Sequence, residues 1–326
     1  MAPGLTLSIA LCTYNGERYL PEQLDSFLRQ TRLPDELVVC DDGSQDGTVS
    51  LMEAFASRAP FPVRLFLNPK NLGHNKNFEQ AISLCRGDII AISDQDDLWL
   101  PGKLANLERM FIKRPQLGYV IHDAAVVDDK LQPLGYTLWE AIGFKPRLQK
   151  IFANGGATEI LFKSQYVWGC TLTLRGDLRP QIFPIPPYWD HDRWIGLIVS
   201  FLARVTLIPQ PLIRYRQHGA QRYGVHKDWA LKNLGRNLTR GQYAQRARMW
   251  TAALTHLAAT ERLDLNQNFL RSMADKIEHL NCRSQMTRSR LRRFPYVLRE
   301  IILGRYHRYS SGWISAVKDL LVSYQE

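Results

Sequence analysis

The chain has 326 residues, of which 45% are hydrophobic and 22% are charged. This composition is typical of a globular protein, and it excludes collagen-like, largely disordered and disulfide-scaffold proteins. The formal net charge of +11 is concentrated at the end of the chain, because residues 226–326 contain 18 Lys and Arg against 8 Asp and Glu, whereas residues 1–225 are nearly neutral. This change in charge predicts two regions, 1–225 and 226–326, with different partners.

In chain order, the first region alternates between apolar runs and segments with helical spacing. Strands are predicted at residues 5–12, 36–40, 63–67 and 89–92, and helices from residue 21 and over 48–58, 75–85 and 101–113. The alternation favours an α/β fold with a doubly wound, mostly parallel sheet. Residues 119–164 show no clear period. Beyond them we expect a strand at 171–174, a helix that opens within 188–194 and runs to 203, and short strands at 205–208 and 212–215.

Polar clusters follow three of the predicted strands. They are Thr13-Tyr-Asn15, Asp41-Asp42 and Asp94-Gln-Asp96. One such cluster is ordinary turn chemistry. Three at the carboxyl edge of one sheet favour a ligand site, because open α/β sheets bind ligands beyond the carboxyl ends of their strands.

The cluster after the fourth strand has carboxylates that suit a hard cation. Asp94 and Asp96 are separated by one residue, so an extended turn can aim both at one Mg²⁺ or Mn²⁺ ion. We expect Asp97 to cap the helix that follows. The sequence has neither the glycine fingerprint of dinucleotide-binding dehydrogenases nor that of P-loop ATPases. A bound diphosphate would therefore need a metal or cationic side chains.

Three segments in this order carry a family resemblance: Ser8-Ile-Ala-Leu-Cys-Thr-Tyr-Asn15, Cys40-Asp-Asp-Gly-Ser-Gln-Asp-Gly-Thr48 and Gly87-Asp-Ile-Ile-Ala-Ile-Ser-Asp-Gln-Asp-Asp-Leu-Trp99. They closely resemble the family-two inverting glycosyltransferases, which have the GT-A fold and use nucleotide-sugar donors. Trp168-Gly-Cys170, His191-Asp-Arg-Trp194 and Tyr215-Arg-Gln-His-Gly219 match as well. The resemblance covers roughly residues 5–225, and this subtype is similar to bacterial surface-polysaccharide rhamnosyltransferases.

The resemblance implies a nucleotide site at the first three strand ends. Thr13, Tyr14 and Glu17 would line the nucleobase pocket. Asp42 would accept a hydrogen bond from the pyrimidine imide, and Asp94 would hold the ribose or the metal.

The resemblance also implies the metal and base positions. Asp96 would coordinate Mn²⁺ or Mg²⁺, together with Asp94, and His218 would contact the metal or the diphosphate. Asp192 would be the general base. Asp190 lies two residues earlier, and the family often has Glu-Asp where this chain has His191-Asp192. Alone, His218 would more often be a structural residue, and His191 is expected to pack rather than to take part in chemistry.

Aromatic residues near the predicted base are candidates for the acceptor or sugar site. Trp168, Trp189 and Trp194 could pack against a sugar face, and burial in the core is the equally weighted alternative.

These roles make a consistent reaction. A metal held by carboxylates offsets the charge that develops on a diphosphate leaving group. A single base on the opposite face gives one displacement with inversion. We therefore expect transfer from a nucleotide-sugar to a hydroxyl of a bacterial surface glycan or of a lipid-linked saccharide acceptor, with dTDP-L-rhamnose as the donor implied by the subtype. The alternatives are a UDP-hexose or UDP-HexNAc donor, and an inactive nucleotide-binding scaffold in a polysaccharide assembly complex.

The basic region 226–326 is predicted to be helical, with helices over 243–260, 265–279 and 295–303. Residues 288–303 form a cationic amphipathic stretch, which favours peripheral membrane contact or oligomerisation; a helical bundle with a solvated basic face is the alternative. A polyprenyl-linked acceptor would give membrane contact a function. We expect no nucleic-acid partner, because no nucleic-acid-binding motif accompanies the charge.

The five cysteines are widely spaced and include no Cys-x-x-Cys pair, which predicts buried thiols in a reducing compartment. The most apolar stretch, 194–203, has about half of the ~20 residues that a membrane span needs, and the first residues lack the basic segment of a secretory signal. The expected location is cytoplasmic, at the inner face of the cell membrane if the basic region binds lipid.

Overall fold

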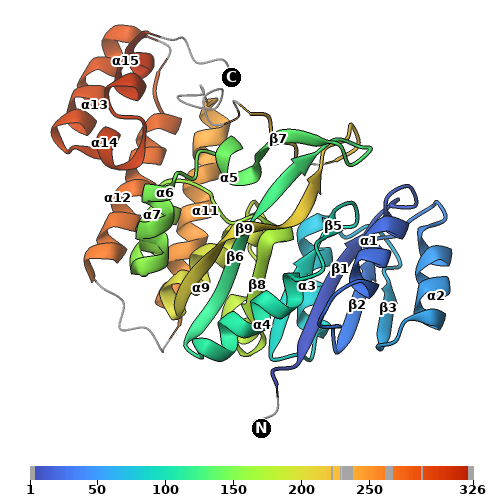
Figure 1. Ribbon diagram of the computed structural model, residues 1–326. Helices are drawn as coiled ribbons and strands as arrows, with labels where there is room; N and C mark the ends of the chain where they lie inside the picture. The colour runs from blue at the N-terminus through green and yellow to red at the C-terminus, as the bar shows by residue number, and fades with distance from the viewer. Residues whose placement is uncertain are drawn as a thin grey trace. The chain divides into compact units, whose positions relative to one another are not determined.

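The computed structural model describes residues 4–221, 223–227, 229, 238–260, 267–287 and 289–321. Its internal contacts divide the chain into two compact units. The N-terminal unit contains residues 1–185 and 190–228, and the C-terminal unit contains residues 186–189 and 229–326. Figure 1 shows both, coloured from blue to red along the chain.

The N-terminal unit is built on a nine-stranded sheet. Eight strands have the order β3-β2-β1-β4-β8-β6-β9-β5, and the ninth, β7, pairs with β6. The strands are β1 (Leu7–Thr13), β2 (Glu36–Asp41), β3 (Val63–Leu67), β4 (Ile89–Ser93), β5 (Leu98–Trp99), β6 (Leu117–Val127), β7 (Pro133–Thr137), β8 (Leu172–Arg175) and β9 (Arg204–Arg216). Strands β3, β2, β1 and β4 are parallel, whereas β8 runs antiparallel between β4 and β6. The sheet is therefore mixed, with a parallel half that matches the prediction.

Helices cover the sheet because its central strands are apolar on both faces; every residue of β1, β2 and β4 is buried. The α-helices of this unit are α1 (Leu20–Leu28), α2 (Thr48–Arg58), α3 (His74–Leu84), α4 (Lys103–Lys113), α5 (Leu138–Ala141), α6 (Pro146–Ile151), α7 (Ala157–Lys163), α8 (Arg179–Ile182) and α9 (His191–Leu202). Pro21 lies in the first turn of α1, where its missing N–H costs nothing, and Leu20, Leu24 and Phe27 form the buried stripe of that helix.

Two local predictions were wrong. Residues 205–208 and 212–215 are one strand, β9, whose pairing with β6 shifts register near Asp123, opposite Pro211. Asp97 does not cap the next helix: Leu98 and Trp99 first pair with β9, and α4 begins at Lys103 after Gly102. The stretch without clear periodicity holds β6, an eleven-residue strand, followed by short helices.

The C-terminal unit is helical, as the sequence predicts. Its helices are α11 (Arg240–Ala258), α12 (Gln267–Ser284), α13 (Arg290–Ile302), α14 (Arg305–Tyr309) and α15 (Trp313–Leu321). Thr239 caps α11 through a reciprocal bond pair with Gln242. Residues 265, 266 and 288 of the predicted helical segments lie outside the described residues. None of the described helices is long and apolar enough to cross a lipid bilayer.

Candidate active site

The ends of β1, β2 and β4 bring the three polar clusters together. These strands are neighbours and parallel, so their carboxyl ends share one edge of the sheet. Thr13 Oγ1 donates to Asp41 Oδ2 at 2.7 Å, which joins the ends of β1 and β2. The main chain of Tyr14 exchanges two hydrogen bonds with the side chain of Gln95, at 2.9 and 3.1 Å, which joins β1 to the acidic segment after β4.

Asp42 is buried and holds the segment that follows β3. Its carboxylate accepts hydrogen bonds from Asn68 Nδ2 at 3.0 Å, Leu72 N at 2.7 Å and Gly73 N at 2.9 Å. An ionised carboxylate has about four acceptor positions, so these donors leave about one for a ligand. Glu17 Oε2 accepts from Gly47 N at 2.8 Å, and the side chain of Tyr14 is exposed. These residues thus frame one side of the strand ends.

Asp96 and His218 are in direct contact, although 122 positions separate them in the sequence. Asp96 Oδ2 lies 2.8 Å from His218 Nε2, and the His218 ring packs against Tyr19 with ring centroids 4.4 Å apart. Within the described part of the chain, His218 Nδ1 is buried without a hydrogen-bond partner. The structure therefore brings together two of the three residues, Asp96 and His218, for which the resemblance implies metal contact.

The carboxyl groups of Asp94 and Asp97 belong to the same acidic segment as Asp96, and the three groups repel one another when ionised. Burial, and then the charges of Asp96 and Asp192, raise the pKa of Asp94 to about 8. Burial and the same kind of repulsion raise the pKa of Asp97 well above its usual value. Asp97 Oδ2 is buried and has no hydrogen-bond partner among the residues described. Such a cluster is incomplete without a positive group.

Lys103 supplies one positive group, and sequence reasoning missed it. Its Nζ is buried, donates to the Cys170 carbonyl at 3.0 Å and lies 3.6 Å from the centroid of the Trp99 ring. Burial lowers the pKa of Lys103 to about 7, opposed by Cys170, Asp97 and Asp94. A signal for it was present: Lys103, Leu107 and Phe111 follow one another at helical spacing, which places the lysine on the buried face of α4.

Two groups of side chains offer metal ligands. One is Asp96 with His218, and the other is Asp94, Asp97 and Cys170, whose ligand atoms lie within 4.8 Å of one another. Burial raises the pKa of the Cys170 thiol well above its usual value, so sulfur stays protonated and binds metal poorly. Carboxylate and imidazole ligands suit Mn²⁺ better than a buried thiol does. The pair formed by Asp96 and His218 therefore fits a divalent cation better than the group with Cys170 does.

Arg216 holds the acidic segment, residues 94–97, in place. It is buried, its Nε donates to the Asp96 carbonyl at 2.8 Å, and its backbone N donates to Asp97 Oδ1 at 3.2 Å. Its guanidinium also pairs with Glu22. These partners make Arg216 a residue that positions Asp96 and Asp97.

Asp192 lies in the first turn of α9, and its charge contributes to the raised pKa of Asp94. Its carboxylate accepts from Gly169 N at 3.1 Å and from Arg193 N at 2.6 Å. Burial and the charge of Asp190 raise the pKa of Asp192 to about 7. A carboxylate with this pKa is suited to accept a proton near neutral pH.

The two neighbours of Asp192 have other contacts. Asp190 precedes α9, and its Oδ1 accepts a hydrogen bond from the Tyr223 hydroxyl at 3.0 Å. The buried ring of His191 stacks on Phe78, with centroids 4.1 Å apart and planes at 12°. His191 is thus a packing residue, as expected.

The tryptophan predictions separate into two outcomes. Trp194 is fully buried and its Nε1 donates to the Ile182 carbonyl at 2.7 Å. Trp189 is buried in the C-terminal unit, and its Nε1 donates to the Met249 carbonyl at 2.7 Å. Neither indole offers a face to a sugar, so an acceptor role for these two was wrong and the core alternative holds. Trp168 is half-buried, with its ring edge-on to Tyr215 at 6.0 Å, and its sugar contact stays a prediction.

Comparison with known proteins agrees with this geometry. Residues 8–164 match the family model described as Glycosyl transferase family 2. An uncharacterised glycosyltransferase of Nostoc sp. is 26% identical over 226 residues, covering 67% of this chain and 67% of that protein.

Solved structures give the same fold. S. aureus TarS 1–349 in complex with UDP-GlcNAc superposes with a TM-score of 0.59 at 18% identity, covering 97% of this chain and 80% of that TarS fragment. The mannosyltransferase PcManGT of Pyrobaculum calidifontis, in complex with GDP-Man and Mn²⁺, gives 0.52 at 17% identity over 98% and 88% of the two chains.

The fold, the carboxylate edge and these matches define the protein as a glycosyltransferase of GT-A type. More particularly, residues 8–164 are similar to the family model described as Glycosyl transferase family 2. The predicted enzyme class and fold class are confirmed.

Proposed function

We propose that this protein is a metal-dependent, inverting glycosyltransferase that moves a sugar from a nucleotide-sugar donor to an acceptor hydroxyl. The observation that carries the proposal is Asp192: a buried carboxylate in the first turn of α9, held by two backbone amides, whose burial raises its pKa to about 7. A scaffold that only binds nucleotide would have no use for a base held in this way.

Asp192 is the proposed general base. The Gly169 and Arg193 amides hold its carboxylate in one orientation without neutralising it. It accepts the proton of the acceptor hydroxyl as the oxygen bonds to the anomeric carbon and the bond to the diphosphate breaks. One displacement with one base inverts the anomeric configuration.

Asp96 and His218 are the proposed holders of Mn²⁺ or Mg²⁺, with Asp94 contributing to the ribose or the metal. The 2.8 Å contact between Asp96 and His218, and the surplus of carboxylates beside it, support this assignment. The bound metal supplies positive charge to the leaving diphosphate. Arg216 and Lys103 would keep the ligands in place from the protein side, and the Mn²⁺ in the PcManGT complex is consistent with the cofactor.

The nucleobase would lie against Thr13, Tyr14, Glu17 and Asp42. A dTDP-L-rhamnose donor follows from the subtype resemblance. A UDP-HexNAc donor is the second candidate, and the UDP-GlcNAc bound by TarS favours it. The proposed acceptor is a bacterial surface glycan or a polyprenyl-linked saccharide, reached by peripheral contact of the C-terminal unit with the membrane.

The test is binding and slow hydrolysis of a donor panel by the full chain, with Mn²⁺, Mg²⁺ or EDTA. We expect one donor to be selected, EDTA to abolish turnover, and Asp96→Ala to weaken metal-dependent binding by at least about tenfold, the equivalent of roughly 1.4 kcal/mol. The matched control is Asp177→Ala, which removes an exposed carboxylate of the same unit and should change nothing. Binding that is indifferent to metal and to Asp96 would refute the mechanism. Nucleotide binding without any turnover would favour the scaffold instead.

A further inference from the structure

The last three helices of the C-terminal unit bury charges and expose apolar side chains. Arg293 and Glu300 on α13 are fully buried, and so is Asp319 on α15. By contrast, Leu291 is 87% exposed, Ile302 75% and Trp313 60%. These helices also bury a small apolar core that includes Val297 and Tyr306. Even so, buried charges together with large exposed apolar side chains are unusual in a water-soluble bundle.

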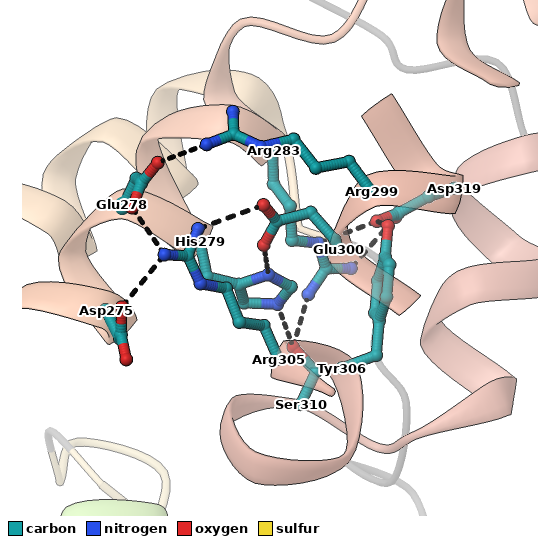
Figure 2. Close-up of polar contacts among 10 residues, drawn as sticks. All are labelled: Asp275, Glu278, His279, Arg283, Arg299, Glu300, Arg305, Tyr306, Ser310 and Asp319. Carbon is teal, nitrogen blue, oxygen red and sulfur yellow. Dashed lines mark hydrogen bonds and ion pairs between the residues drawn. The ribbon is translucent and has the colours of Figure 1, made fainter. Parts of the chain in front are cut away.

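Figure 2 shows what holds the buried charges. His279 Nδ1 lies 2.6 Å from Glu300 Oε2, and its Nε2 lies 2.9 Å from Ser310 Oγ. Glu300 also pairs with Arg305 at 3.2 Å. The network thereby joins α12, α13 and α14.

Asp319 is the second centre of this network. It pairs with Arg283 at 2.8 Å and accepts a hydrogen bond from the Tyr306 hydroxyl at 2.6 Å, while its carbonyl accepts from Arg293 Nη1 at 2.7 Å. Removing one partner of a buried ion pair is costly. The inward faces of α13 and α15 are therefore fixed by their charges, and neither helix can turn its apolar side inward without breaking them.

Seven of the exposed apolar residues recur at helical spacing on α13 and α15; Tyr296 and Ile314 are exposed as well, outside these two series. On α13 the series has intervals of three and four residues, and on α15 it has intervals of four. They are Leu291, Phe294, Leu298 and Ile302 on α13, and Trp313, Val317 and Leu321 on α15. We call these seven residues the outer apolar face. The two helices pack together, joined by Arg293 and Asp319, and exposed apolar side chains on packed helices are typical of an interaction site.

The charges that accompany this face are positive. Residues 290–321 contain two acids, Glu300 and Asp319, and both are buried in the network. Arg290, Arg292 and Arg308 are exposed. Asp275 and Glu278 on the adjacent α12 are paired with Arg305 and Arg299.

We propose that the outer apolar face docks onto an anionic lipid surface, with the apolar side chains at the acyl boundary and the arginines at the headgroups. Amphipathic helices with Trp, Phe and Leu on one side and Arg on the flanks bind in this way without spanning the bilayer. A second copy of the chain is a poorer occupant, because self-association would bring the same positive rim against itself. The inference deepens the proposed membrane contact and rests on that part of the proposed function.

The experiment is co-flotation of the full-length protein with vesicles of phosphatidylcholine alone, or with about 30% phosphatidylglycerol to supply an anionic surface. We expect binding to the anionic vesicles only. Ile302→Glu with Trp313→Glu should abolish it, and Arg290→Gln with Arg292→Gln should weaken it by roughly tenfold or more, since each cation near the surface contributes about 1 kcal/mol. The control is Ile112→Glu, which puts the same charge on an apolar residue 54% exposed on α4. Circular dichroism confirms that each variant is folded.

Three results would overturn the proposal: no binding of the wild type to anionic vesicles, equal binding to neutral ones, or unchanged binding of the double variant that carries Ile302→Glu and Trp313→Glu. Light scattering can give a fourth result that would overturn the proposal. If the wild type is a dimer in solution that the same two substitutions convert to a monomer, a second copy occupies the face. The assay contains no nucleotide or sugar, so a negative result leaves the transferase proposal intact. Conversely, vesicle binding survives if every donor fails.

Discussion

Replacing Asp192 with Asn should lower activity while making the folded protein more stable at alkaline pH. The structure moves the pKa of Asp192 from 3.8 to about 7, mainly by burial. Between these pH values the folded protein keeps a proton that the unfolded chain has lost. Stability therefore falls as pH rises through this window. At about 1.36 kcal/mol per pH unit, the full cost above pH 7 is about 4 kcal/mol.

Asparagine removes this cost, because it cannot ionise. It also has only one side-chain oxygen, so the Gly169 or the Arg193 amide loses its acceptor, at about 1–3 kcal/mol. The net gain at pH 8 is about 1–3 kcal/mol, or several degrees of melting temperature. In the same protein kcat should fall by about 10²–10⁴-fold, the usual contribution of a general base.

The assay is paired: thermal melting at pH 5.5 and pH 8, and donor turnover with an acceptor across the same range. The wild type should lose melting temperature between the two pH values by several degrees more than Asp192→Asn. Its kcat/KM should rise with pH to a plateau above about 7, the pKa of the proposed base. Asp97 titrates in both proteins, whereas the pKa of Asp94 falls in the variant because the charge of Asp192 is gone; the difference between the two profiles therefore reports Asp192 together with its effect on Asp94. If the two melting profiles change in parallel, the pKa of Asp192 is not raised; if turnover survives within tenfold, Asp192 is not the base.

Three further predictions test neighbouring parts of the structure. Asp190→Asn removes the charge that helps raise the pKa of Asp192, so the rise of kcat/KM should move to lower pH while the plateau stays within about tenfold; a loss as severe as in Asp192→Asn would assign the base to Asp190. Lys103→Met removes the buried cation beside Asp94 and Asp97. Because this lysine is proposed to keep the metal ligands in place, calorimetry should show that the affinity for Mn²⁺ falls by about tenfold while the protein stays folded. Unchanged affinity would leave the lysine a structural role only. Glu300→Gln breaks the buried pairs with His279 and Arg305, and should destabilise the C-terminal unit by about 3–5 kcal/mol in urea while donor hydrolysis persists; a smaller loss would mean that the network does not hold α13.

The edge of the sheet was predictable because it depends on local sequence. Each apolar run is long enough to be a buried strand, and each ends at residues that stop a strand. Parallel neighbours then put Thr13, Asp42 and Asp94 at one edge, whichever helices cover the faces. The expected α/β fold and C-terminal helices follow from the same patterns, and the structure and its neighbours confirm them.

The residues that hold the site in place, Arg216 and Lys103, were not predictable, because their roles depend on contacts between residues far apart in the sequence. Arg216 reaches Asp96 and Asp97 from 120 and 119 residues away, and Lys103 meets the Cys170 carbonyl 67 residues away. Asp97 looked like a helix cap because a polar residue before an apolar segment usually is one. The pairing of Leu98 with Arg214 on β9 overrides that local preference.

The orientation of the helices in the C-terminal unit could not be predicted from the sequence, for a different reason. A helix such as α13 has an apolar stripe and a charged stripe, and the period of the sequence does not say which one faces inward. In most soluble proteins the charged stripe faces the solvent and the apolar stripe faces the core. Here Arg293 and Glu300 on α13 find opposite charges or carbonyls on α12, α14 and α15, so the charged stripe can be satisfied inside. The apolar stripe is left outside, and its burial must come from something other than this unit. The network thus explains how the apolar face can stay exposed in this unit, and this exposure is what the proposed contact with a lipid surface would remove.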